Sequence, residues 1–355
     1  VSHRACLQTL DFPLTGQDAT FQGCVLSAGI GQAPARQAAH LAGLSFEVSA
    51  TTLNKMCGSG MQALLFAYDA LKASSYRFIL AGGMESMSQA PYLLKKARAG
   101  YRLGHGPLLD HLLLDGLEDA YHPGSLMGVF AETIARQYHF SRDQQDAYAH
   151  ESMQRALKAQ TAQAFQAELA PLETLLTQDE HPDPQKLTKI PRLKPVFLPE
   201  GTITPASSSA ISDGAASLLL TTRALADNHH LPILATLTGH ATFAAAPQEF
   251  PTAPIKAIEK LLSTLGWTMP QVDRFEINEA FAVVPLAAMQ ALKIPHEKLN
   301  VRGGACALGH PIGASGARIV VTLLHTLIQD NLTRGVASLC IGGGEATALA
   351  IERSL

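Results

Sequence analysis

The sequence predicts an α/β fold made of two similar halves with a polar insertion between them. Three observations carry this prediction: a strand, glycine turn, helix and strand over residues 48–87, the same pattern over 299–344, and a charged stretch between them. Such units favour parallel strands lying between layers of helices. A chain of 355 residues that is 47% hydrophobic is long enough for two packed cores.

The first pattern begins with VSATTLN as a predicted strand, followed by the glycine-rich turn MCGSG. The next segment, MQALLFAYDALK, predicts a helix because its apolar residues recur at helical spacing and share one face. The segment RFILAGG then predicts a buried strand.

The second pattern repeats this plan. LNVRGG is predicted as a strand, ALGHPIGASG as a glycine-rich turn, ARIVVTLLHTL as an apolar helix and VASLCIGGG as a strand. Both patterns begin with Leu-Asn, place G-x-S-G or G-A-S-G ahead of the helix, and close on consecutive glycines. This correspondence predicts an internal repeat.

The segment between the two patterns has charged helical stretches and the proline-bearing loop QDEHPDPQKLTKIPRLKP, which predicts a lid or a substrate-binding surface. The strand SDGAASLLLTTRALA then returns to the first half. We therefore expect an N-terminal half of residues 1–87 plus 208–230, an insertion of 88–207, and a C-terminal half of 231–355.

Composition excludes several classes of protein. With 27 Lys+Arg against 30 Asp+Glu the net charge is -3, and without a basic run we expect no nucleic-acid partner. We find no apolar stretch of the roughly 18 residues that a membrane span needs, and no signal peptide, so we expect a soluble, cytoplasmic protein without a membrane partner. Five scattered cysteines with no C-x-x-C predict neither a disulfide framework nor a zinc site.

Cys57 lies in the first glycine-rich turn, immediately before a predicted helix. Unpaired backbone N–H groups and the helix dipole stabilise an anion there, so we expect the pKa of this thiol to be lowered. The glycines beside it leave room for a bulky acyl thioester. The alternative is a small buried side chain without chemistry.

Three further residues follow from the repeat and from strand ends. His310 lies in the turn that corresponds to the turn of Cys57, and two such turns can meet where the halves join. Cys340 ends a predicted strand, at the edge where open α/β sheets place ligands, although a core thiol is the alternative. Gly342 offers an unobstructed backbone N–H. Asn278 follows the strand of FEINEAF and could orient a water or donate to an oxyanion, or cap a helix.

Taken together, these segments resemble the thiolase family over nearly the whole chain. The matching segments are GQAPARQAA, NKMCGSG, GGMESMS, NEAF, GGACALGHPIGASGAR and CIGGG. The resemblance implies two αβαβα halves with an inserted loop domain, assembled as a homodimer or homotetramer. It implies reversible Claisen condensation of acyl-CoA units, or coenzyme A-dependent thiolysis of a 3-ketoacyl-CoA, with no metal or other cofactor.

The resemblance also implies a role for each candidate. Cys57 would form the acyl-enzyme, His310 would activate it, and Cys340 would move the α-proton of the second acyl-CoA. One oxyanion hole would combine His310 with a water held by Asn278, and the other the backbone N–H groups of Cys57 and Gly342. The remaining matches are Ser209 against the pantetheine of coenzyme A, and Met127 and Phe281 along the acyl pocket.

The chain departs from the family pattern in three places. It begins inside what the family treats as its first helix, so we expect a central strand of the N-terminal sheet, with its Arg-Thr-Pro segment, to be missing from this chain. Leu126 stands where short-chain members often have His. Ser207 and Arg302 stand where Asn is common. The last two departures concern acyl specificity and coenzyme contacts.

Two other functions remain open. A ketoacyl synthase shares the fold but usually pairs its cysteine with two histidines or with His and Asn, which Cys340 disfavours. A non-catalytic acyl-CoA or lipid binding protein on the same scaffold is the alternative from another class. The occurrence of Cys57, His310, Cys340 and Asn278 together disfavours it. Acyl chain length and the direction of the reaction remain open.

Overall fold

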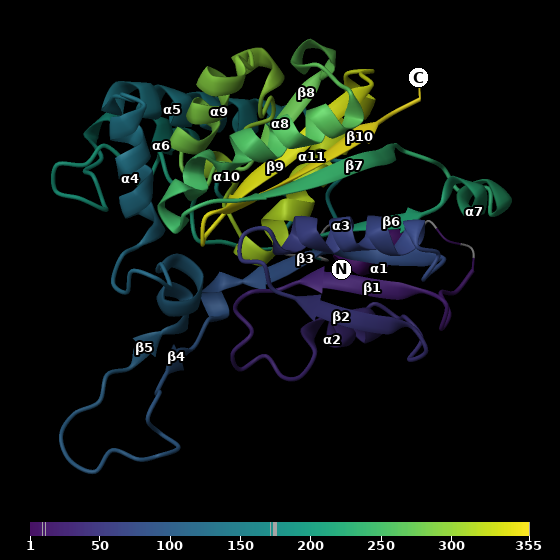
Figure 1. The fold of residues 1–355 in the computed structure, drawn as a ribbon, viewed down its shortest axis with the longest axis horizontal. Helices are drawn as coiled ribbons and strands as arrows, with labels where there is room; N and C mark the ends of the chain where they lie inside the picture. Colours follow the sequence, from purple (N-terminus) through teal and green to yellow (C-terminus); the bar gives the residue numbers. More distant parts are fainter. Residues whose placement is uncertain (9, 11, 171, 173–175, 355) are drawn as a thin grey trace.

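The computed structural model describes residues 1–8, 10, 12–170, 172 and 176–354. It stacks helices and sheets in five alternating layers (Figure 1). Helices α1 (Ser2–Leu7) and α2 (Pro34–Leu41) cover the outer face of one sheet, and α8 (Ala253–Leu265) covers the outer face of the other. Helices α3 (Ser59–Lys72) and α11 (Ile312–Gln329) form the layer between the sheets. The predicted α/β architecture with two similar halves is therefore present.

Four strands make the N-terminal sheet, in the order β2-β1-β3-β6. They are β1 (Ala19–Gly23), β2 (Ser49–Leu53), β3 (Phe78–Ser86) and β6 (Asp213–Thr221). The first three are parallel, and β6 pairs antiparallel with β3 from Phe78↔Thr221 to Ser86↔Asp213. Helix α7 (Arg223–Asn228) follows β6.

The expectation that this sheet lacks a central strand is wrong. Each of its four strands is hydrogen-bonded to the next in an unbroken order. The second sheet has the order β7-β10-β9-β8, in which β7 (Thr236–Ala244) lies at the edge beside β10 (Glu345–Glu352). By the internal repeat, β6 corresponds to β10. The position in the first sheet that corresponds to β7 is therefore the outer edge of β6.

The C-terminal sheet also contains β8 (Arg274–Ile277) and β9 (Arg334–Ile341), which are parallel to each other. Helices α9 (Val283–Leu292) and α10 (Ala305–Leu308) lie between them in sequence. The predicted strand LNVRGG is wrong beyond its first residue. Only Leu299 makes a bridge, to Phe275, and Asn300 and Gly303 turn the chain with φ values of 46° and 76°.

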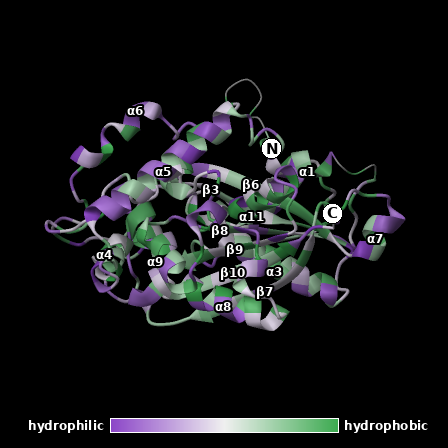
Figure 2. Ribbon diagram, turned by 90° about the horizontal axis from the view of Figure 1, so that it is seen from above, coloured by the Kyte–Doolittle hydropathy of each residue, from purple (hydrophilic) through white to green (hydrophobic). Residues whose placement is uncertain are grey.

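Strand alternation explains how the layers are held. In β3, Phe78 and Leu80 face the core under α1 and α2, whereas Ile79 and Ala81 face α3 and α11. Both sets are at most 1% exposed, so β3 is buried on both sides. Figure 2 shows the same arrangement, with hydrophobic ribbon gathered on the inner strands and α11 and hydrophilic ribbon on α6 (Pro184–Leu187) at the rim.

Helix α11 corrects a second expectation. Its 18 residues have a mean hydropathy of 1.3, which satisfies the length and composition of a membrane span. However, 72% of this segment is buried inside the protein, against α3 and both sheets. It has the character of a core helix that is apolar all round.

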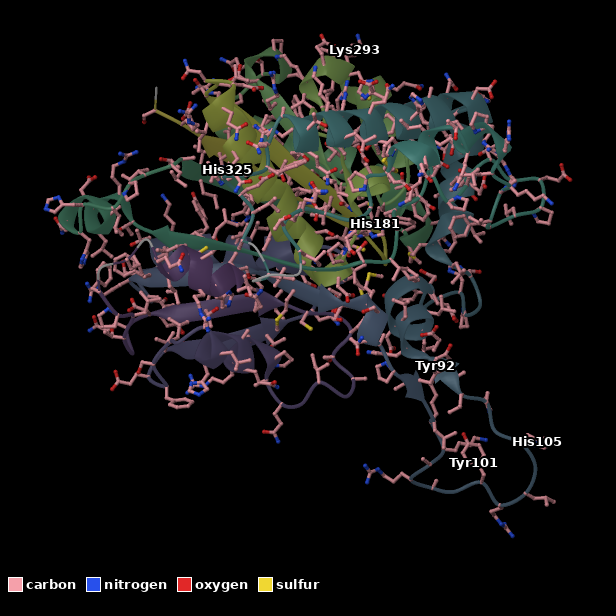
Figure 3. The ribbon with its side chains drawn as sticks, turned by 180° about the vertical axis from the view of Figure 1, so that it is seen from behind. Tyr92, Tyr101, His105, His181, Lys293 and His325 are labelled. Carbon is pink, nitrogen blue, oxygen red and sulfur yellow. The ribbon has the colours of Figure 1, made fainter. Side chains whose placement is uncertain are left out.

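The insertion lies beside the C-terminal half and carries a projecting arm. Its helices are α4 (Met127–Gln137), α5 (Arg142–Thr161) and α6. The arm is the hairpin of β4 (Tyr92–Leu93) and β5 (Leu109–Asp110) together with the loop between them. Figure 3 shows Tyr92, Tyr101 and His105 along this arm, away from the body of the molecule.

Candidate active site

The turn that carries Cys57 is fixed by side chains on both sides of it. Met56 has a left-handed φ of 47°, and its N–H donates to Asn54 Oδ1 at 2.9 Å. Ser59 Oγ accepts from the Lys55 N–H at 2.8 Å and donates to the Met56 carbonyl at 2.7 Å. Helix α3 begins at Ser59, so Cys57 precedes a helix as predicted.

Glycine is required directly after the cysteine by a close approach. A Cβ on Gly58 would lie 2.3 Å from Ile341 Cδ1, at the end of β9. The absence of a side chain at Gly58 therefore lets the Cys57 turn rest against the strand that carries Cys340.

The Cys57 thiol is held by two backbone donors, the N–H of Gly342 and its own N–H. Gly342 thus has the predicted free N–H, aimed at this sulfur. The expectation that the thiol pKa is lowered is wrong, because burial outweighs both donors and raises the pKa of Cys57 to about 11. The resting side chain is therefore a thiol, and a base has to remove its proton.

Cys340 lies in β9 and is 1% exposed. Burial raises the pKa of the Cys340 thiol well above its ordinary range, and the neighbouring Cys57 raises it further. Two thiols this close disfavour a second negative charge, so at most one of them ionises readily.

His310 lies between α10 and α11 and is 5% exposed. Its Nδ1 is 2.5 Å from Ser315 Oγ, and this hydroxyl donates onward to the Pro311 carbonyl at 3.0 Å. Ser315 therefore accepts from Nδ1–H, which leaves Nε2 without a proton. Burial first, and then the charge of Arg318, lower the pKa of His310 to about 3, so the ring is neutral at neutral pH.

Asn278 follows β8 and directs its amide at this imidazole. Its Nδ2 is 3.5 Å from His310 Nε2, a long contact that fits an amide donating to the unprotonated nitrogen. Among the described residues, its buried Oδ1 has no hydrogen-bond partner. An oxygen in this state has the capacity to hold a water.

The predicted binding residues lie on the segments around these groups. The Ser209 N–H donates to the Ala280 carbonyl at 3.0 Å, and the His310 N–H donates to the Ala210 carbonyl at the same distance. Phe281 and Cys340 belong to one buried apolar cluster, and Met127 packs against it. Met127 Sδ is 3.3 Å from where a Cβ on Gly342 would lie.

A second apolar cluster joins the two halves of the site. It contains Ile312, two residues after His310, and Cys57 packs against it. The structure therefore places Cys57 beside Cys340 and Gly342, and His310 beside Asn278, and the Ile312 cluster connects these two groups. Ser209, Phe281 and Met127 lie on adjoining segments.

Two supporting residues were not predicted. Ser315 sets the tautomer of His310, and Glu85 accepts from the N–H groups of Val25, Leu26 and Gly313 at 2.8–3.1 Å. Glu85 thereby ties the end of β3 to the first turn of α11. The sequence offered one indication of this role, which is the carboxylate of Glu85 within the otherwise uncharged segment GGMESMS.

The comparisons with known proteins agree with this geometry. The N-terminal domain of thiolase matches residues 3–224, and the C-terminal domain of thiolase matches residues 231–353. The chain belongs to the thiolase family. Among the described residues, no group of three His, Cys, Asp or Glu side chains is arranged to hold a metal ion in this thiolase.

Curated relatives and solved structures cover most of this thiolase. It is 48% identical over 344 residues to the "Probable acetyl-CoA acetyltransferase" of Dictyostelium discoideum, covering 95% of the chain and 83% of the relative. It is 42% identical over 345 residues to the "Acetyl-CoA acetyltransferase" of Pseudomonas aeruginosa, covering 95% and 88%.

A solved structure of Acat5 thiolase from Ascaris suum in complex with coenzyme A superposes with a TM-score of 0.94 at 39% identity, covering 99% of this chain and 91% of that one. The thiolase fold and the enzyme class expected from the sequence are confirmed, and neither alternative function is favoured.

Proposed function

We propose that this thiolase joins two molecules of acetyl-CoA into acetoacetyl-CoA and coenzyme A, and runs the reverse thiolysis with the same groups. The observation that carries the proposal is the partly buried Cys57 thiol, which receives the Gly342 N–H and has the Cys340 thiol beside it. The names of the relatives, acetyl-CoA acetyltransferase and acyltransferase, agree with it.

In the first half-reaction Cys57 becomes acylated. His310 Nε2 takes the proton of the Cys57 thiol as its sulfur attacks the thioester carbonyl. A free Cys57 thiolate is therefore not required before the attack. The N–H groups of Cys57 and Gly342 stabilise the oxyanion. The carbon–sulfur bond to coenzyme A then breaks, and the leaving thiolate takes the proton of Cys340.

In the second half-reaction Cys340 acts as the base. Its thiolate removes the α-proton of the second acetyl-CoA, while protonated His310 and a water on Asn278 stabilise the enolate oxygen. The enolate carbon attacks the acyl-enzyme, and the tetrahedral intermediate expels the Cys57 sulfur. His310 returns its proton to Cys57, so every proton is accounted for and no metal or other cofactor is needed.

A short acyl group fits the side chains around this site. Met127 approaches Gly342, and Phe281 packs edge-on against Phe197 and Phe250, with ring centroids 5.6 and 6.4 Å away. Methylenes that find no room lose about 0.8 kcal/mol of burial each or clash. We therefore infer a preference for four-carbon over long 3-ketoacyl-CoA substrates.

The test is thiolysis over a ladder of 3-ketoacyl-CoA lengths, with and without added coenzyme A. We expect acetoacetyl-CoA to be consumed fastest and only when coenzyme A is present. Equal rates on four- and sixteen-carbon substrates would remove the short-chain assignment. A protein that binds these thioesters but consumes none of them would instead be the non-catalytic alternative.

We also propose that the enzyme works as an assembly of two or four copies. Among the described residues, edge strand β2 pairs with β1 alone, so its other edge is open to the same strand of a second copy. The projecting arm bears the exposed apolar side chains of Leu103, Leu108 and Tyr92, which are 64–99% exposed. Apolar groups exposed to this degree favour contact with another chain.

A further inference from the structure

The buried carboxylate of Glu279 stands at the centre of a hydrogen-bond network next to the site. Glu279 directly follows Asn278 and is 0% exposed. Four donors reach its two oxygens: Tyr148 Oη at 2.9 Å and Asn300 Nδ2 at 2.8 Å on one, Ser152 Oγ at 2.7 Å and the Cys306 N–H at 3.0 Å on the other.

These donors come from three separate segments. Tyr148 and Ser152 lie one turn apart on α5 of the insertion, and Asn300 lies in the turn after Leu299. Cys306 lies in α10, which leads into the His310 turn. One carboxylate therefore joins the Asn278 loop, the His310 turn and the insertion.

Both hydroxyls in the network also lie within reach of another donor, and their hydrogens are directed at the Glu279 oxygens. Ser152 Oγ accepts from the Gly304 N–H at 3.0 Å, and Tyr148 Oη accepts from Asn300 Nδ2 at 3.2 Å. All four groups donate to the two carboxylate oxygens. The four donors are neutral, so burying this charge is costly unless every bond is made.

A neutral amide cannot replace this carboxylate without loss. In Glu279→Gln, the NH₂ group would face either the Cys306 N–H or the Asn300 amide, and neither can accept a hydrogen bond. One of the two segments would move away, because a donor facing a donor is unfavourable. No space remains for an alternative, since a Cβ on Gly304 would already lie 2.4 Å from Glu279 Cδ.

We propose that Glu279 is a positioning residue for the enolate side of the reaction, holding Asn278 and the His310 turn at their working separation. The inference rests on the proposed function. Glu279 bonds to neither the Cys57 turn nor the β9 segment with Gly342. Acyl-enzyme formation uses His310 but not Asn278, whereas α-proton removal uses both, so acylation should depend on Glu279 less than α-proton removal does.

The experiment compares two partial reactions in purified Glu279→Gln protein. Acylation is measured as the rate of labelling of Cys57 by radioactive acetyl-CoA, and enolate formation as exchange of the acetyl-CoA α-protons with D₂O. We expect exchange to fall on the order of 10- to 100-fold, less than the roughly 10²- to 10³-fold loss when an oxyanion donor is removed outright, and acylation to fall no more than about 3-fold. Equal losses in both, or no loss in exchange, would overturn the proposal.

A double-mutant cycle tests whether Glu279 acts through Asn278. Glu279→Gln should change exchange by a smaller factor in Asn278→Ala than in the wild-type protein, because residues acting as one unit are not additive. If the effects of the two substitutions on exchange are fully additive, Glu279 does not act through Asn278.

The matched control is Glu276→Gln, the same change three residues earlier on β8. Glu276 is 2% exposed but faces Arg318, with 3.8 Å between Oε2 and Nη1. We expect it to leave the ratio of exchange to acylation unchanged. A similar shift in this control would mean that any buried carboxyl group at this sheet matters, and would overturn the specific role of Glu279.

If Glu279→Gln does not fold, Tyr148→Phe and Ser152→Ala each remove one donor and keep the carboxylate. Each should move the ratio in the same direction by a smaller factor, and an unchanged ratio in both would contradict the proposal. A wild-type protein that neither acylates nor exchanges would instead show that the proposed function has failed.

Discussion

The candidate nucleophile is a partly buried thiol, and the imidazole proposed to activate it is neutral, so the site holds no preformed thiolate–imidazolium pair. Burial raises the pKa of Cys57 to about 11 and lowers the pKa of His310 to about 3. Both shifts have the same physical cause, since a buried site disfavours either charged form. Substrate carbonyl and oxyanion donors must therefore be in place before the proton moves.

Substitutions should separate the roles of the two cysteines. Cys57→Ser should lose nearly all acyl transfer, because a hydroxyl ionises far less readily than a thiol. Cys340→Ser should still form the acyl-enzyme on Cys57, although more slowly because its hydroxyl is a weaker proton donor to the leaving coenzyme A. It should condense about 10²- to 10⁴-fold more slowly, as expected for a lost general base. His310→Ala should depress both steps.

Two measurements check all three variants: mass spectrometry locates the acyl group on the protein, and an activity assay gives the condensation rate. Cys6→Ser is the control, because Cys6 lies in α1 and donates to the Ser217 carbonyl. An acyl group mapped to Cys340, or wild-type condensation by Cys340→Ser, would reverse the assignment.

The neutral state of His310 also predicts how stability depends on pH. Between about pH 6.5 and 3 the unfolded His310 binds a proton and the folded one does not, so stability falls as the pH is lowered through this window. At pH 5 this difference amounts to about 2 kcal/mol, from 1.36 kcal/mol per pKa unit.

Urea unfolding at pH 7 and pH 5 measures the effect. His310→Asn should lose less stability between these two pH values than wild type, by about 2 kcal/mol. His3, whose pKa burial lowers to about 4, contributes equally to both proteins. Identical pH dependence in the two would show that His310 is not buried as a neutral base.

At the scale of elements, the contact between α3 and α11 sets the distance between the two halves of the site. The helices approach closely because both carry glycine where they meet. A Cβ on Gly316 would lie 2.4 Å from the Met61 backbone nitrogen, and one on Gly60 would lie 2.8 Å from the Ala317 nitrogen. The Cys57 turn begins one helix, and the His310 turn begins the other.

A methyl group at this contact should be destabilising. Gly316→Ala would push α11 away from α3, and we expect a loss of about 1–3 kcal/mol of unfolding free energy, the range for an overpacked core. Urea denaturation measures the loss. Gly16→Ala is the control, because its Cβ would meet only ordinary contacts at 3.6 Å or more and should change stability by less than about 0.5 kcal/mol.

At the scale of the whole molecule, strand β2 is the place where a second copy would extend the sheet. It is an edge strand, and Thr51 at its centre is exposed. If two copies pair there about a two-fold axis, Thr51→Lys would bring like charges together across the interface. Sedimentation should then give a multiple of 37.7 kDa for wild type and a lower multiple for the variant.

Thr20→Ser on the neighbouring strand β1 is the control for this experiment, because Thr20 is 0% exposed and keeps its hydroxyl. We expect it to sediment as wild type does. A wild-type protein of 37.7 kDa in solution would contradict the assembly itself. Unchanged assembly of Thr51→Lys would place the interface elsewhere.

Local sequence patterns were sufficient to predict the helices and turns that carry the candidate residues. Apolar spacing predicted α3, and short segments rich in glycine predicted the turns of Cys57 and His310, because helix periodicity and turn conformation depend on neighbouring residues. The internal repeat predicted two similar halves. LNVRGG was mistaken for a strand, because its apolar start resembles one while Asn300 and Gly303 adopt left-handed φ values.

The pKa shifts of the site and the hydrogen bonds that support it depend on packing between distant segments. The pKa of Cys57 depends on burial by segments from both halves, which no local pattern reports. Glu279 meets Tyr148 across 131 residues of sequence, and Glu85 meets Gly313 across 228. Hydrogen bonds between segments so distant along the chain exist only after the layers have packed, because packing is what removes water from these groups and brings their partners within reach.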